Sequence, residues 1–177
     1  MGLKIYFYNG SKENTQGASV ANDSLKIPKI KRQVSMWVHP EGQVIGSLFL
    51  REQSVNHAGV EEPIEVLNRD NAFIVLDREE AGHIRFYNRN AIIRVEYEET
   101  SPLMGPEQKI IPCQLTMMDG ALFNGVIRET LAPDRARLFD YLNHEQARFI
   151  KLYTDTNQIY LVNKSYIINV ATETSDI

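Results

Sequence analysis

Two short polar pairs are the residues of this sequence best suited to chemistry. Asn88-Arg89 and Asn163-Lys164 each join an amide to a cation at a predicted hairpin tip. An amide can read a base edge or a peptide group, and a cation can meet a phosphate or a carboxylate. The same pairs are also ordinary turn residues, because Asn tolerates the left-handed conformation and a long cation stays solvated. Both interpretations stay open at this point.

A second amide recurs with similar spacing, since Leu67-Asn68 is repeated as Leu142-Asn143. These residues could line a ligand cleft. Alternatively, the Leu covers the core while the Asn ends a helical turn or caps backbone donors. The candidate ligand or RNA contacts are therefore Asn68, Asn88, Arg89, Asn143, Asn163 and Lys164.

The sequence carries no catalytic or metal-binding signature. It has no nucleophile elbow, Gly-rich phosphate loop or HExxH motif, and its four histidines lie far apart. Cys113 is the only cysteine, so neither an intrachain disulfide nor a thiolate cluster can form. We expect a protein that is not an enzyme and holds no metal or cofactor, with Cys113 as a small buried side chain.

The candidate residues belong to an internal duplication. Four blocks recur in the same order 75 or 76 residues later, which chance would not produce in register. Further upstream, 33–37 is matched with 114–118, and the Arg-Glu pair at 51–52 with that at 128–129. The downstream matches are 67–68 with 142–143, 73–76 with 149–152, 84–89 with 159–164, and 92–95 with 167–170.

Each copy is expected to form five short strands and one helical turn. The segments are rich in β-branched and aromatic residues and are bounded by Gly, Pro, Asn and Asp. Alternation in the fourth strand predicts that Ile84 and Phe86 face inward and Tyr87 outward. Gly46 and Gly125 lie where the second strand must bend. The expected strands are 34–38, 44–51, 73–77, 83–88 and 91–97, then 114–118, 121–128, 149–153, 158–162 and 165–171, with helical turns at 65–68 and 139–144.

The predicted organisation is all-β, with two tandem five-stranded small barrels. Residues 4–8 alternate in polarity and could add an edge strand to either barrel. The five segments are an N-terminal strand and flexible loop (1–27), the first barrel (28–97), a linker with two prolines (98–108), the second barrel (109–172) and a tail (173–177).

The order of these elements resembles the Sm-like, SH3-like small barrels, and in particular the bacterial Sm-like RNA chaperones. The first copy reads VSMWVHPEGQVIGSLFLRE, FIVLD and FYNRNAIIRVEY, and the second reads LTMMDGALFNGVIRE, LFDYLN, FIKLY and YLVNKSYIINV. The resemblance implies RNA contact at the last hairpin, where the family places Arg-Gly or Lys-His. This chain keeps the cation there, as Arg89 and Lys164, without the second residue.

Composition favours binding by a soluble, cytoplasmic protein. With 43% hydrophobic and 24% charged residues, the chain is too apolar for disorder and too charged for a membrane span. We expect an interaction or assembly module that binds a protein partner or itself as a homo-oligomer. The alternative is an Sm-like RNA-binding protein acting as a ring or pseudo-ring. The net charge of −4 does not favour nucleic acid, and the one basic concentration comprises Lys26, Lys29, Lys31 and Arg32.

Overall fold

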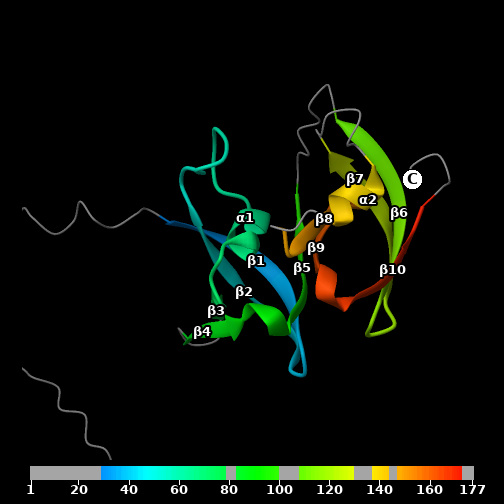
Figure 1. Ribbon diagram of the computed structural model, residues 1–177. Coiled ribbons are helices and arrows are strands. Elements are labelled where there is room, and N and C mark those ends of the chain that lie inside the picture. The colour runs from blue at the N-terminus through cyan, green and yellow to red at the C-terminus, as the bar shows by residue number, and fades with distance from the viewer. Residues whose placement is uncertain (1–28, 79–82, 100–107, 130–136, 144–146, 173–177) are drawn as a thin grey trace, which may run out of the picture.

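The computed structural model describes residues 29–78, 83–99, 108–129, 137–143 and 147–172. These residues form an all-β protein, as predicted. Ten strands make one antiparallel sheet with the order β10-β6-β7-β8-β9-β5-β1-β2-β3-β4 (Figure 1). The predicted N-terminal segment 1–27 and tail 173–177 lie outside the described residues. So do Pro28 and most of the linker 98–108.

The two halves contain the same elements in the same order. Each half has a helical turn before its third strand and a 3-10 turn between its fourth and fifth strands, so all ten strands and both helical turns of the sequence analysis are present. The first half comprises β1 (Lys29–Val38), β2 (Gly42–Arg51), α1 (Pro63–Asn68), β3 (Phe73–Arg78), β4 (His83–Asn88), η1 (Arg89–Ala91) and β5 (Ile92–Glu98). The second half comprises β6 (Lys109–Met117), β7 (Leu122–Glu129), α2 (Leu138–Leu142), β8 (Phe149–Tyr153), β9 (Gln158–Asn163), η2 (Lys164–Tyr166) and β10 (Ile167–Ala171).

The first strand of each half begins earlier than its apolar pattern suggests. β1 starts at Lys29, which pairs with Arg51, and β6 starts at Lys109, which pairs with Glu129. Backbone pairing does not depend on apolar side chains, so a strand can continue beyond the buried part of the sheet. The basic residues from Lys29 to Arg32 therefore lie on a strand rather than on a loop leading into it.

Gly46 and Gly125 occupy equivalent positions where the second strand crosses the third. A Cβ at Gly46 would lie 2.6 Å from the backbone oxygen of Asp77, and one at Gly125 would meet that of Tyr153. Only glycine allows this approach, which confirms the matching of the two glycines in the sequence.

The pairing of the first strand corrects the upstream part of the repeat alignment. Trp37 pairs with Arg94, whereas Thr116 pairs with Asn169, the repeat equivalent of Arg94. Trp37 therefore corresponds to Thr116 and not to Met118, so the true alignment is shifted by two residues. A shift of two preserves the inward and outward pattern of a strand, which is why alternation alone could not reveal it.

The expectation of two separate closed barrels is not met by the strand pairing. Each half has the order fifth-first-second-third-fourth strand, but it is not closed on itself. Instead β5 of the first half pairs with β9 of the second, which makes the sheet continuous. The long-range pairing of two complete repeats could not be read from local sequence patterns.

Candidate functional site

The junction between β5 and β9 joins the two halves through backbone, apolar and polar contacts. The two strands pair in antiparallel register from Arg94 opposite Val162 to Glu98 opposite Gln158. Figure 1 shows both strands between the two halves, with α1 beside them. The helical turn α1 belongs to the first half but packs against β8 of the second.

Apolar side chains of each half enter the core of the other. Phe149, Ile159 and Leu161 of the second half belong to the core cluster of the first, beside Val95. In return, Ile93 of β5 belongs to the core cluster of the second half. The junction is therefore part of the hydrophobic core, and not a surface contact between two finished domains.

Two of the candidate amides hold the junction. The side chain of Asn68 donates to the backbone oxygen of Phe149 at 3.0 Å and accepts from its backbone N–H at 2.8 Å. The side chain of Asn163 donates to the backbone oxygen of Ile92 at 2.8 Å. Phe149 and Asn163 are partners in the β8–β9 register, so the two amides act at one place. They satisfy backbone groups that the packing removes from water.

Arg94 supplies a buried charge to the same junction. Its guanidinium donates to Glu96 at 2.7 Å and to Asp119 of the second half at 2.9 Å. It also lies over the rings of Trp37 at 4.1 Å and Phe123 at 5.0 Å. A planar guanidinium suits such a site because it stacks on aromatic faces while its edge donates to carboxylates.

Lys151 is a second buried cation between the halves. Its ammonium lies 2.8 Å from Glu62 and 3.7 Å from Glu99, both of the first half. Burial opposes the charge, but the neighbouring Tyr97 oxygen and the Glu62 carboxylate favour it more, and the pKa of Lys151 is raised. Lys151 is therefore charged at neutral pH and links the halves electrostatically.

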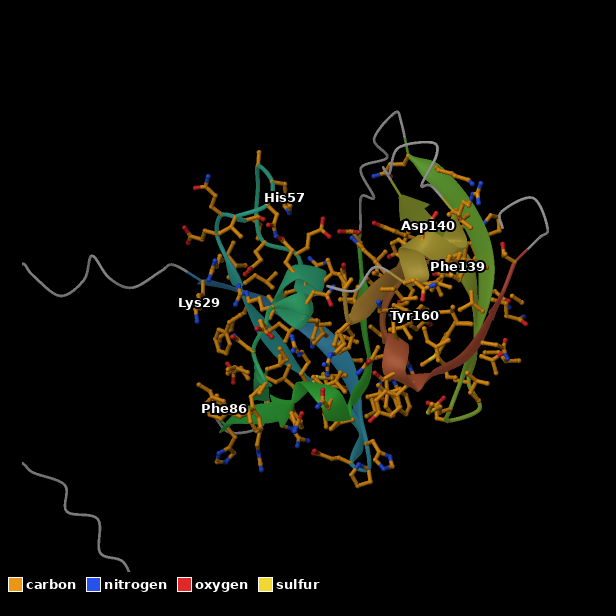
Figure 2. All side chains as sticks on the ribbon, viewed as in Figure 1. Lys29, His57, Phe86, Phe139, Asp140 and Tyr160 are labelled. Atoms are coloured by element: carbon orange, nitrogen blue, oxygen red, sulfur yellow. The ribbon has the colours of Figure 1, made fainter. Side chains whose placement is uncertain are left out.

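The repeat equivalents of these junction strands are unpaired at their outer edges among the described residues. β4 corresponds to β9, and β10 corresponds to β5. β4 and β10 lie at opposite ends of the strand order. Figure 1 shows them on opposite sides of the molecule. In Figure 2, Phe86 of β4 lies at the outer margin, whereas Tyr160 of β9 lies near the middle.

Equivalent apolar residues differ sharply in exposure between the junction and the open edges. Phe149, Ile159 and Leu161 are 1%, 2% and 0% exposed. Their equivalents Phe73, Ile84 and Phe86 are 53%, 54% and 69% exposed. Likewise, Ile93 is 9% exposed and its equivalent Ile168 is 60% exposed. The open edges thus display the same apolar face that the junction buries.

This contrast corrects the predicted orientation of the fourth strand. Phe86 faces outward and Tyr87 is buried, the reverse of the prediction. In the equivalent strand β9, the matching residues Ile159 and Leu161 lie on the side that the first half covers. Tyr87 instead joins the core of its own half. Periodicity reveals two faces and does not say which one the core covers.

The six candidate residues of the sequence analysis all make structural contacts in the described chain. Asn88 and Asn163 accept from the backbone N–H of Asn90 and Ser165, which caps the two 3-10 turns. The other four donate to backbone oxygens: Asn68 to that of Phe149, Arg89 to that of Arg69, Asn143 to that of Phe139, and Lys164 to that of Leu142. The structure brings Asn68 and Asn163 together at the junction and leaves Asn88 and Asn143 exposed.

A pocket of about 380 Å³ lies on the open face of the first half. Phe49, Phe73, Ile84 and Phe86 contribute apolar walls, and Lys29 and Arg69 also line it. Among the described residues, no three His, Cys, Asp or Glu side chains converge as a metal site would require. Cys113 is buried, and burial raises the pKa of its thiol to about 11, which agrees with its predicted role as a core side chain.

Comparison with known proteins adds no relative. No protein-family model, curated protein or solved structure matches this chain. Within the described residues, neither helix has the length and apolar character needed to cross a membrane.

Proposed function

We propose that this protein is a non-enzymatic interaction and assembly module. In this proposal, two Sm-like five-stranded units, fused and joined through β5 and β9, bind protein through the free edges of β4 and β10. The observation that carries it is the exposure of Phe73, Ile84 and Phe86, whose equivalents are buried wherever a neighbouring half covers them.

The physical basis is that a free strand edge is a binding site for another strand. An unpaired edge presents a row of N–H and C=O groups that can extend the sheet into a partner. Natural proteins usually block such edges with charge, proline or a short strand. β4 contains no proline, and its own residues on the face of Ile84 and Phe86 carry no charge. Main-chain pairing would supply affinity, and the apolar face would supply specificity.

The Sm-like architecture rests on the repeated order of elements. Each half has the strand order fifth-first-second-third-fourth, a helical turn before the third strand and a 3-10 turn before the fifth. The second strand of each half crosses the third at a glycine. This combination supports a strongly bent sheet of the small-barrel kind in each half.

RNA binding is the second candidate, and one observation favours it. The exposed rings of Phe73 and Phe86 line the same pocket as Lys29 and Arg69. Exposed rings can stack bases while nearby cations meet phosphates. This hypothesis expects U- or A-rich RNA to bind with strong salt dependence, and it expects Lys29→Ala to weaken that binding and to reduce its salt dependence. If neither RNA nor DNA shifts the protein at low salt, it fails.

Site-specific photo-crosslinking in cells tests the proposed function. A photoreactive phenylalanine replaces Phe86 or Ile168 on the free edges, or Val55, which is 73% exposed on a loop, as the matched control. We expect discrete protein adducts from positions 86 and 168 and none from position 55. Equal labelling at all three positions would contradict an edge-directed interaction.

A further inference from the structure

The two junction strands, β5 and β9, have unpaired repeat equivalents at the two ends of the described sheet, β10 and β4. Resting on the proposed function, we infer that β10 of one copy pairs with β4 of the next, in the register that β5 and β9 use within the chain. The partner is thus a second copy of this protein, bound head to tail. The steps below transfer each junction contact to its repeat equivalents.

The apolar surfaces are complementary in this arrangement. Within the chain, Ile93 enters the second core, and Ile159 and Leu161 enter the first. Between copies, Ile168 would take the place of Ile93, and Ile84 and Phe86 those of Ile159 and Leu161. These three residues are all more than half exposed in the single chain. Pairing the two ends would remove them from water together.

The polar contacts also have equivalents. Asn68 clamps the backbone of Phe149 within the chain, and their equivalents are Asn143 and Phe73. Asn143 of one copy would turn from its bond to Phe139 and bind the backbone of Phe73 in the next. Asn163 donates to the oxygen of Ile92, and so Asn88 would donate to that of Ile167. The paired amides found in the sequence thus act once within the chain and once between copies.

The helical turn α2 completes the resemblance between the two contacts. α1 packs on β8 at the internal junction, with Ile64 against the core of the first half. Its equivalent α2 carries Phe139, which is 67% exposed (Figure 2). In the head-to-tail contact Phe139 would lie against the pocket beside Phe73 and Phe86 of the next copy. The larger ring would help to compensate for Thr172, the small equivalent of Tyr97.

The contact between copies is expected to be weaker than the internal one. Asn169 and Val75 stand where the junction has the buried cations Arg94 and Lys151, so the ion pairs with Asp119 and Glu62 have no counterpart. Assembly would therefore be reversible while the internal junction stays closed. Because the two ends differ, the contact is heterologous and repeats until it closes a ring or grows a filament.

The transferred register gives a direct test by disulfide trapping. Glu96 faces Tyr160 within the chain, so Ala171 of one copy should face Arg85 of the next. Residues directly opposite in antiparallel strands have Cα atoms about 4.5–5.5 Å apart, within disulfide range. Chains with Ala171→Cys and chains with Arg85→Cys, distinguished by mass, are mixed and oxidised. We expect mixed dimers, and neither variant should form dimers alone.

Three controls make the result specific. The variant Glu96→Cys, Tyr160→Cys should form the corresponding disulfide within one chain. His83→Cys mixed with Ala171→Cys is two residues out of register and should trap far less dimer. The unmodified chain measures any reaction of the buried Cys113.

Phe86→Asp should lower the oligomeric mass to that of a monomer, and Val55→Asp should not.

Dimers from either single variant alone, or no mixed dimers, would overturn the head-to-tail inference. So would equal trapping at positions 83 and 85. These failures are distinguishable from failure of the proposed function. If position 86 is photo-crosslinked only to other proteins, the interaction module stands while self-assembly is wrong.

Discussion

β9 and β4 are the same strand of the repeat in two different settings. In β9, Ile159 and Leu161 are buried by the first half, whereas in β4 the equivalent Ile84 and Phe86 face solvent. The two strands have the same length, and each pairs with the third strand of its own half, β3 or β8. The difference teaches that the apolar face of this strand joins a core only where a neighbouring half covers it.

The largest expected effect separates these two faces. Leu161→Ala should lower the free energy of unfolding by about 3 kcal/mol, because it leaves a cavity in a closed core. The matched change Phe86→Ala should alter the unfolding free energy of dilute monomer by less than about 0.5 kcal/mol, because the ring is already in water. Urea unfolding of both variants measures this, and equal losses would contradict the comparison.

The next effect concerns the buried cation of the junction. Arg94→Ala leaves Asp119 without its partner and removes the stacking on Trp37, so we expect a loss of about 2 kcal/mol. Asn169→Ala, at the equivalent position of β10, should change stability by less than about 0.5 kcal/mol. The same unfolding measurement applies, and a costly Asn169 variant would show that β10 is not an open strand.

A smaller effect is expected from the two clamping amides. Asn68→Ala removes two hydrogen bonds across the junction and should cost about 1–2 kcal/mol. Asn143→Ala removes only a local bond to Phe139 and should cost about 0.5 kcal/mol, yet it should also weaken self-association. Unfolding and sedimentation together measure both properties. If Asn143→Ala leaves the oligomeric mass unchanged, the amide has no role between copies.

Much of the architecture was predictable because its signals are local. Alternation and turn residues gave ten strands and two helical turns, and the duplication singled out the amide pairs. The β5–β9 pairing was not predictable, since it joins residues 60 to 68 positions apart through backbone groups that every residue carries. The orientation of Phe86 was predicted wrongly because it also depends on which face of the strand another part of the chain covers. Arg94 was missed, although a single charge among Ile92, Ile93 and Val95 could have signalled a buried, partnered cation.

The smallest expected effect compares the two helical turns through pH. Burial opposes ionisation of Glu65, but hydrogen bonds from Ser54, the Glu62 backbone and Asn56 outweigh it and lower its pKa below its usual value. A lowered folded pKa stabilises the protein above the unfolded value, and this contribution is lost as the pH falls through the folded value.

Glu65→Gln should therefore reduce stability at about pH 6 and flatten its fall toward about pH 3. Asp140→Asn, the matched change in α2, should do neither. Unfolding free energies at both pH values measure the slopes. Parallel slopes for Glu65→Gln and the unmodified chain would contradict the role given to this carboxylate.

Hydrogen exchange as a function of protein concentration tests the central claim most directly. If β4 and β10 are open equivalents of β9 and β5, the amides of β5 and β9 should be protected at every concentration. Those on the outer edges of β4 and β10 should gain protection together, only at concentrations where the oligomeric mass rises. Protection of β4 and β10 in the dilute monomer, or exchange that ignores association, would contradict it.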